Sequence, residues 1–258
     1  MTATLRLVAI GWLMQLKMRS RSAFDGALGI IYPLFFATTV LLVYRQNGDE
    51  AALVAAAVGA SVMGVWSAVS TTAASSLQQE RREGTLELLV ASPRQFSLVV
   101  LPMTVAMATI GLYSLVATLL WGRFVFGIHI SFAHPVEFVV AALVTAAAIG
   151  VIGFLEAVAS VRYRSAWALG SALELPVWLI CGFLVPLSLL PDWVRPISWL
   201  LPPTWGVAAV RDAALGGGSP WPDIALCILT GAAYGVIGAL VSRRVVDSAR
   251  SDATLALT

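Results

Sequence analysis

The chain alternates long apolar runs with short polar segments, and this pattern predicts membrane-spanning helices. A helix that crosses the bilayer core needs about 20 mainly apolar residues. Six stretches have this length, namely residues 24–44, 51–74, 97–121, 136–161, 166–188 and 223–242. Because the segments between them are short, neighbouring helices are expected to be antiparallel. The sequence therefore predicts an all-α polytopic membrane protein, with residues 1–258 forming one transmembrane domain of six helices.

The composition agrees with a membrane protein. Apolar residues make up 59% of the chain and charged residues 12%, and the mean hydropathy is +0.87. Soluble domains have roughly 45–50% apolar and about 25% charged residues. The net charge of +2 provides no strong positive field that would attract nucleic acid.

The positive charges predict the orientation of the chain. Counted across the six spans, twelve Lys and Arg residues fall on one side and four on the other. The twelve are Arg6, Lys17, Arg19, Arg21, Arg81, Arg82, Arg94, Arg162, Arg164, Arg243, Arg244 and Arg250, and the four are Arg45, Arg123, Arg195 and Arg211. Since cytoplasmic loops carry the excess of Lys and Arg, both termini are expected in the cytoplasm.

The N-terminal segment is expected to form an amphipathic helix in the inner membrane interface. Leu5, Val8, Trp12 and Leu16 recur at helical spacing, which is typical of such helices. A disordered N-terminus is the alternative. The first cluster of cations follows the apolar run 7–14 instead of preceding it, so a signal peptide is not expected.

An external segment, residues 189–222, interrupts the regular pattern of spans. It contains four of the nine tryptophans and six of the twelve prolines. Indole rings concentrate at membrane interfaces, and proline divides this segment into short apolar pieces at 194–201 and 204–215. We therefore expect a re-entrant or interfacial helical hairpin before the last span. The alternative is a seventh span through residues 199–215, which would place the C-terminal cations outside.

Catalytic and metal-binding motifs are absent from the sequence. The only lysine, Lys17, follows Leu16, whereas a phosphate-binding loop requires a lysine directly after a glycine. There is no GxSxG and no HExxH, and the two cysteines and two histidines have no metal-type spacing. No catalytic residue and no metal site are expected, so energy for transport would come from an ion gradient or from a partner.

Two carboxylates, Glu156 and Glu174, fall inside predicted spans. They lie about 8 Å and about 12 Å from the inner ends of successive helices at 1.5 Å per residue, so the two can face each other at similar depth. Carboxylates within the membrane are costly and often mark a substrate or proton path. The alternative for Glu156 is a structural pairing with Arg162 or Arg164. For Glu174, the nearby Pro176 favours a bend that frees backbone groups.

The predicted cytoplasmic loop, residues 75–96, is rich in charge. Ser75 and Ser76 each precede a glutamine by three residues, an arrangement that resembles a capping box and predicts a short helix as far as Glu83. Gly84 is expected to end it, and Thr85 to begin a second piece that Pro93 stops. Two short surface helices with a charged edge would form a docking platform, although a charged run of this kind is also typical of a solvated face.

Two segments resemble a known family. The run from Gln79 to Pro93, QERREGTLELLVASP, closely resembles the "ER…GTLE.L..(S/T)P" segment that follows the second span of ABC-2 type transporter permeases. The run from Leu201 to Gly217, LPPTWGVAAVRDAALGG, is similar to the second block of that family, roughly "NPLTY…ALR..LLGG". It departs from the usual Asn and Tyr, which leaves the cargo open.

This resemblance implies the ABC-2 exporter fold and an ATP-driven mechanism. Two permease chains, identical or homologous, would pair, and each would dock a soluble ABC-type ATPase that binds ATP and Mg²⁺. This chain would hold no cofactor of its own. The coupling segment that enters the ATPase would comprise Glu80, Arg81, Arg82, Glu83, Gly84, Thr85 and Glu87.

The cargo and two alternative functions remain open at the level of sequence. The apolar spans favour a hydrophobic or amphipathic cargo, such as a drug, antibiotic or lipid-like molecule, with a glycan as the alternative. A gradient-driven transporter would instead use Glu156 or Glu174. A membrane-embedded enzyme would require clustered His, Asp or Glu, which the sequence does not provide. The excess of arginine over lysine and the abundant alanine favour a GC-rich bacterial source and its plasma membrane.

The charge distribution predicts the sides on which two positions lie. In intact cells, a cysteine replacing Arg250 should be protected from an impermeant maleimide, and one replacing Asn47 should be labelled, because the predicted topology places them on opposite sides. The native Cys181 and Cys227 are replaced by alanine in both variants. Labelling of both positions, or of neither, would show that a span has been miscounted.

Overall fold

The computed structural model describes residues 2–20, 23–46, 49–85, 88, 96–162 and 167–252, and these residues form helices and connecting turns without a strand. The all-α prediction is therefore confirmed for this part of the chain. In order, the helices are α1 (Thr2–Ser20), α2 (Ala23–Arg45), α3 (Glu50–Arg82), α5 (Ser97–Phe126), α6 (Pro135–Arg162), α7 (Trp167–Ile180), the 3-10 helix η2 (Leu187–Leu189), α8 (Arg195–Leu200), α9 (Pro202–Leu215) and α10 (Trp221–Asp252).

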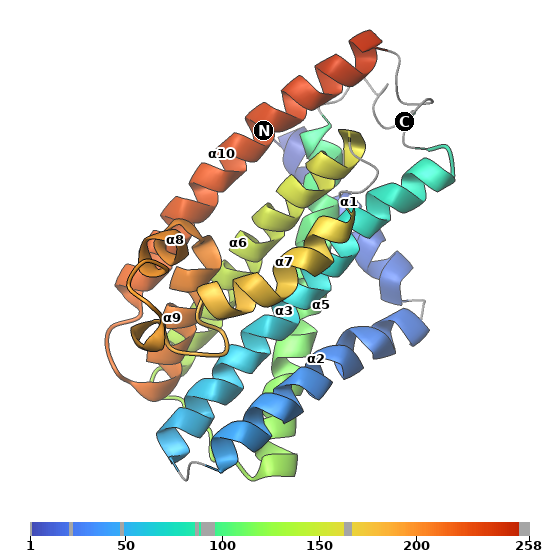
Figure 1. Ribbon diagram of the computed structural model, residues 1–258. Coiled ribbons are helices and arrows are strands. Elements are labelled where there is room, and N and C mark those ends of the chain that lie inside the picture. The colour runs from blue at the N-terminus through green and yellow to red at the C-terminus, as the bar shows by residue number, and fades with distance from the viewer. Residues whose placement is uncertain are drawn as a thin grey trace.

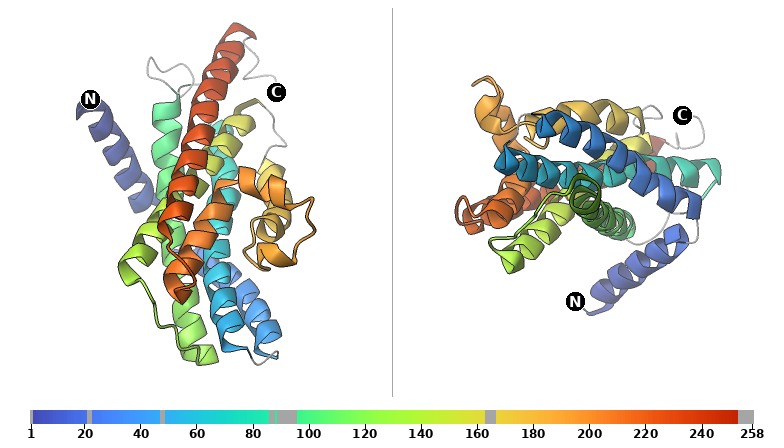
Figure 2. Two further views of the ribbon diagram at one scale, coloured as in Figure 1. Left: turned by 90° about the vertical axis from the view of Figure 1, so that its left-hand side faces the viewer. Right: turned by 90° about the horizontal axis from the view of Figure 1, so that it is seen from below.

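Helix α3 lies at the centre of the bundle. It packs against α2, α5, α6, α7 and α9, as the views in Figures 1 and 2 show. In its apolar part 78% of the residues are buried, against 22% in the corresponding part of α10. The small side chains of α3, mostly alanine, valine and serine, allow its neighbours to approach closely.

Among the described residues, four helices are long and apolar enough to cross a membrane, which supports a membrane-embedded protein. The qualifying parts are Glu50–Ser70, Ser97–Phe126, Pro135–Val161 and Trp221–Val245. They agree with four of the six predicted spans. Helix α2 coincides with the predicted span 24–44. The full set of six spans remains a prediction.

The fifth predicted span differs from the structure. Residues 166–188 were expected to form one helix, but α7 ends at Ile180 after 14 residues. Gly182 then adopts a left-handed conformation with φ of +77°, and the chain turns before Pro186. Glycine has no Cβ to oppose this conformation, so it stops a helix at small cost. The long apolar run therefore contains a helix followed by a turn.

The loop after the second predicted span also begins later than predicted. A new helix capped by Ser75 or Ser76 is wrong, because α3 continues without a break to Arg82. The Gln, Glu and Arg residues there are good helix formers, and no Gly or Pro lies between Gly64 and Gly84. The prediction that Gly84 ends the helix is confirmed, since this residue has φ of +71°. The second piece, expected from Thr85 to Pro93, lies mostly outside the described residues.

The external segment contains two short helices, close to the predicted pieces. Leu201 is extended, with φ of −92° and ψ of 121°, and separates α8 from α9. Pro202 and Pro203 then occupy the first turn of α9, where proline fits because no amide donor is needed there. No single helix runs through residues 199–215, and the 14 residues of α9 span only about 21 Å, so the structure gives no support to a seventh span. The re-entrant position of this hairpin remains a prediction.

Helix α1 lies obliquely against α5 (Figure 2). The Trp12 indole donates a hydrogen bond to the Thr109 hydroxyl at 3.0 Å, about 18 Å along α5 from its first residue. The contact between α1 and α5 therefore extends well beyond the first turns of α5. Helix α1 begins and α10 ends at the upper end of the bundle in Figure 1, consistent with termini on one side. The interfacial position of α1 and its cytoplasmic side remain predictions.

Close packing of α3 and α5 predicts a measurable stability effect. A Cβ atom at Gly111 would lie 2.9 Å from the Val65 Cα and 3.2 Å from its carbonyl oxygen, so Gly111→Ala should destabilise the protein by about 1–3 kcal/mol. A Cβ at Gly235 on α10 would meet only the Val151 Cγ1 at 3.8 Å. Thermal unfolding in detergent should therefore show a lower Tm for Gly111→Ala and an unchanged or higher Tm for Gly235→Ala. Equal effects would contradict the close crossing.

Candidate functional site

The predicted coupling segment forms a compact turn at the end of α3. The Thr85 amide donates to the Glu80 carbonyl oxygen at 2.9 Å, and the Thr85 hydroxyl donates to the same oxygen at 3.1 Å and to the Glu80 carboxylate. The Gly84 amide donates to the Arg81 carbonyl at 3.2 Å. Glu80 and Thr85 therefore close the turn.

Arg81 points toward the neighbouring helix. Its Nη2 donates to the Ser160 carbonyl at 3.3 Å and to the Val161 carbonyl, both at the C-terminal end of α6. A cation is favourable there, because the last carbonyl groups of a helix carry partial negative charge. Arg81 thus joins α3 to α6.

The three residues that follow Arg81 form the outer face of this turn. Arg82, Glu83 and Gly84 are exposed. Of the seven predicted coupling residues, the structure brings six together within one turn, and Glu87 lies outside the described residues. Among the six, these three are the most accessible to a partner.

The two predicted carboxylates contact the same face of α3, one from α6 and the other from α7. The Ser70 hydroxyl donates to the Glu156 carboxylate of α6 at 3.2 and 3.3 Å. The Ser67 hydroxyl donates to the Glu174 carboxylate of α7, and Tyr32 of α2 donates to the same group at 3.3 Å. Ser67 and Ser70 are three residues apart and therefore lie on adjacent turns of the same face. That the two carboxylates face each other at similar depth in the membrane stays a prediction.

Both carboxylates are buried, with 8% of Glu156 and 6% of Glu174 exposed. Within the described ranges neither takes part in an ion pair. Of the predicted partners of Glu156, Arg164 lies outside those ranges, and the side chain of Arg162 is also outside the described part of the chain. The hydroxyl partners were not anticipated from the sequence. The feature of the sequence that could have predicted these partners is a pair of serines three residues apart within an apolar span.

Another group of polar contacts, which was also not predicted from the sequence, lies at the end of the bundle opposite the turn that follows α3. We call it the Arg211 junction. Arg211 of α9 donates from Nη2 to the Phe183 carbonyl at 2.8 Å and from Nε to the Ala55 carbonyl of α3 at 3.3 Å. A Cβ atom at Gly59 would collide with the Phe183 carbonyl and lie 2.5 Å from the Arg211 Nη2, so a glycine there leaves room for the guanidinium. A lone arginine within a largely apolar helix was the signal in the sequence.

Two further side chains hold the turn after α7. Tyr44 of α2 donates to the Leu184 carbonyl at 2.9 Å, and Ser198 of α8 donates to the Ile180 carbonyl at 2.6 Å. Carbonyl groups at a helix end have no partner within the helix, and these side chains supply one. Together with Arg211, they connect α2, α3, α8 and α9 to the end of α7.

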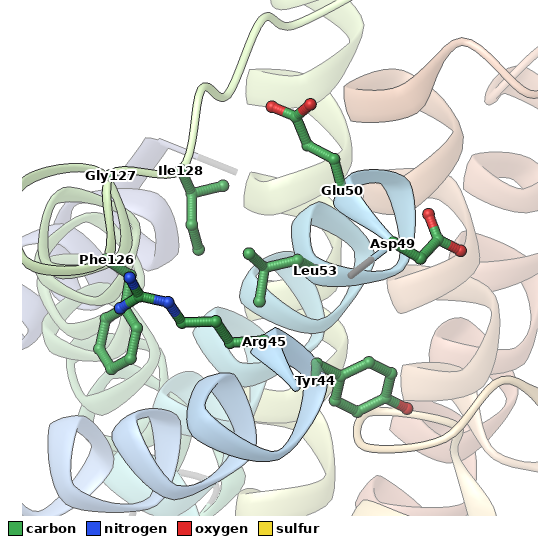
Figure 3. Close-up of a pocket in the computed structure, with 8 residues that line it drawn as sticks. All are labelled: Tyr44, Arg45, Asp49, Glu50, Leu53, Phe126, Gly127 and Ile128. Atoms are coloured by element: carbon green, nitrogen blue, oxygen red, sulfur yellow. The ribbon is translucent and has the colours of Figure 1, made fainter. Parts of the chain in front are cut away.

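A shallow pocket of about 210 Å³ lies at this same end, between the turn after α2 and the end of α5 (Figure 3). In Figure 3 the side chains of Arg45, Asp49 and Glu50 point in different directions. Asp49 accepts hydrogen bonds from the Ala51 and Ala52 amides at 3.0 and 3.3 Å, so it caps α3. The pocket contains none of the predicted site residues.

Metal binding finds no support in the described part of the chain. No three His, Cys, Asp or Glu side chains gather there in a way that could hold an ion. Cys181 and Cys227 are both free and buried.

Comparison with known families identifies the chain. A model of the ABC-2 type transporter family matches residues 6–215. The chain belongs to the ABC-2 type transporter family. No curated protein matches the sequence.

Membership gives the general role of the ABC-2 permease. Such chains are the membrane components of ABC transporters, are typically not catalytic themselves, and work with an ABC-type ATPase. The match includes both the turn at the end of α3 and the Arg211 junction of α9.

The hydrogen bonds of Arg211 predict that a substitution of this residue changes the reactivity of the Cys181 thiol. Arg211→Met removes both hydrogen bonds, and a bond to a charged group typically contributes about 1.5–3 kcal/mol. The turn after α7 should loosen, so Cys181, which is 0% exposed, should react faster with maleimide in a Cys227→Ala background.

Arg195→Met is the matched control, because Arg195 makes an exposed ion pair with Asp192 at 3.1 Å near the same turn. This variant should leave the reactivity of Cys181 unchanged. Equal reactivity in the Arg211→Met and Arg195→Met variants would mean that Arg211 does not hold the turn.

Proposed function

We propose that this chain is the permease of an ATP-driven exporter that moves a hydrophobic or amphipathic cargo out of a bacterial cell. A separate ATPase subunit binds ATP and Mg²⁺ and drives the cycle. Two permease chains, identical or homologous, pair in the plasma membrane with their termini in the cytoplasm. Family membership supports the ABC permease role, and the charge distribution supports the orientation.

The observation that carries the proposal is the turn at the end of α3. Arg82 and Glu83 lie exposed on a turn that Glu80 and Thr85 close, so the turn presents charge in a fixed geometry. Charge arranged in this way favours a specific partner surface over nonspecific contact. The same turn lies at one end of a continuous helix of 33 residues, about 48 Å long.

Helix α3 connects the turn to helices α6, α7 and α9. Arg81 links its inner end to α6, Ser70 and Ser67 link its middle to α6 and α7, and Arg211 of α9 binds it at Ala55. A displacement imposed at the turn would therefore reach α6, α7 and α9 through bonded contacts. Movement of packed rigid elements is a common way to transmit a conformational change.

A gradient-driven transporter is the second candidate. Buried carboxylates are typical of proton and ion paths, and Glu156 and Glu174 are both buried with hydroxyl partners. Transport by the purified permease alone, driven by an imposed proton gradient, would favour this function over the ATP-driven one.

The coupling proposal predicts the effect of charge reversal. A variant with Arg82→Glu and Glu83→Lys should insert and fold, because both side chains are exposed. It should bind its ATPase at least tenfold more weakly, since mispaired charges at an interface cost several kcal/mol. Co-purification with the partner ATPase, followed by measurement of ATP hydrolysis by the complex, tests this.

Arg45→Glu is the control variant, because Arg45 is an exposed arginine at the opposite end of the bundle. It should retain normal complex formation. If the double reversal binds the ATPase and couples hydrolysis to export as the wild type does, the turn is not the docking element.

A further inference from the structure

Side chains bridge the space between α2 and α7. Both helices pack against α3, and two contacts join them to each other. The Tyr32 hydroxyl of α2 meets the Glu174 carboxylate of α7 at 3.3 Å, and the Phe36 ring of α2 lies 5.0 Å from the Trp178 ring of α7. We call these four residues the α2–α7 seam.

The aromatic rings of the seam lead from the surface to the interior. Phe35 is 69% exposed and Tyr32 is 44% exposed, whereas Trp178 is 1% exposed. The Phe36 ring contacts all three in edge-to-face geometry, with centroid distances of 5.8, 4.9 and 5.0 Å to Phe35, Tyr32 and Trp178. The rings thus form a continuous path between the exterior and the carboxylate.

The carboxylate at the inner end of this path lacks a cationic partner among the described residues. Glu174 is 6% exposed and accepts hydrogen bonds from Ser67 and Tyr32 alone in that part of the chain. The Trp178 indole nitrogen is also buried, and no hydrogen-bond acceptor faces it. An anionic group beside aromatic rings in an apolar environment attracts an organic cation through both charge and ring quadrupoles.

We propose that the α2–α7 seam binds a hydrophobic organic cation, which is the cargo class of this permease. The cation replaces the Tyr32 hydroxyl beside Glu174 and lies against the rings of Phe36 and Trp178. Tyr32 is suited to move aside, because it is partly exposed and its hydrogen bond to Glu174 is long. This inference rests on the proposed exporter function, because it names the cargo.

Glu156 provides an internal comparison. It is buried to the same degree and accepts hydrogen bonds from a serine of the same helix, α3. None of the aromatic pairs of the described residues lies beside it, since those pairs join residues of α2 and α7 or involve Phe132 and Phe138. Glu156 therefore has a buried carboxylate without one of these ring pairs, so it serves as the matched control.

The test is binding of tetraphenylphosphonium to the purified full-length chain in nanodiscs, with tetraphenylborate as an anion of the same shape. Wild type should bind the cation and show no Glu174-dependent binding of the anion. Glu174→Gln should weaken cation binding by about tenfold or more, and Glu156→Gln should leave it within about twofold. Tyr32→Phe removes the competing hydroxyl and should leave affinity equal or higher.

Phe36→Leu is a second variant that keeps the carboxylate and removes the ring. It should weaken cation binding about threefold to tenfold, the range expected for loss of a cation–π contact. Equal affinity of wild type and Glu174→Gln, or an equal loss in Glu174→Gln and Glu156→Gln, would overturn the proposed site. An unchanged affinity in Phe36→Leu would overturn the role of the rings.

The experiments distinguish an error in the proposed cation site from an error in the proposed exporter function. Binding is measured without an ATPase and without transport. Cation binding at Glu174 together with absence of ATP-driven export would overturn the exporter function and leave the site intact. ATP-driven export of an uncharged cargo without cation binding would overturn the site alone.

Discussion

A polar group inside an apolar helix bundle must find its partner within the protein, and this constraint shapes the arrangement around α3. This helix is buried against five others, so water is not available to its inward polar groups. Its serines donate to carboxylates of α6 and α7, and its Ala55 carbonyl accepts from Arg211. These bonds determine which residues of neighbouring helices can lie opposite one another.

The same contacts connect the two ends of the molecule. Arg81 is bonded to the last carbonyls of α6, close to the turn that carries Arg82 and Glu83. Arg211 is bonded to α3 about 40 Å away along that helix. These hydrogen bonds therefore join α6 and α9 to α3 near its two ends.

The two buried carboxylates show how environment separates similar residues. Glu156 and Glu174 have nearly equal exposure and each bonds a serine of α3. Only Glu174 has the aromatic side chains of α2 and α7 beside it among the described residues, together with a partly exposed tyrosine. For this reason the proposed cargo site is at Glu174 and not at Glu156, although the sequence places both in the same class.

Features that depend on near neighbours in the chain could be predicted from the sequence. Apolar length gave most of the helices, Gly84 ended α3, and the prolines at 202 and 203 began α9. The charged segment after the second span and the block ending in Gly217 gave the family, and both lie almost wholly within its match. The end of α7 was not predicted, although Gly182 and Pro186 follow it, because the residues around them continue the apolar run.

The side chains that meet across the bundle could not be predicted, because their contacts depend on how the helices pack. Ser70 and Glu156 are 86 positions apart, Ser67 and Glu174 are 107 apart, and Tyr32 and Glu174 are 142 apart. Helical periodicity places a residue on one face of its own helix and leaves open which other helix covers that face. The inward direction of Arg81 and the junction at Arg211 follow from the packing of α6 and α9 against α3, which no local pattern in the sequence specifies.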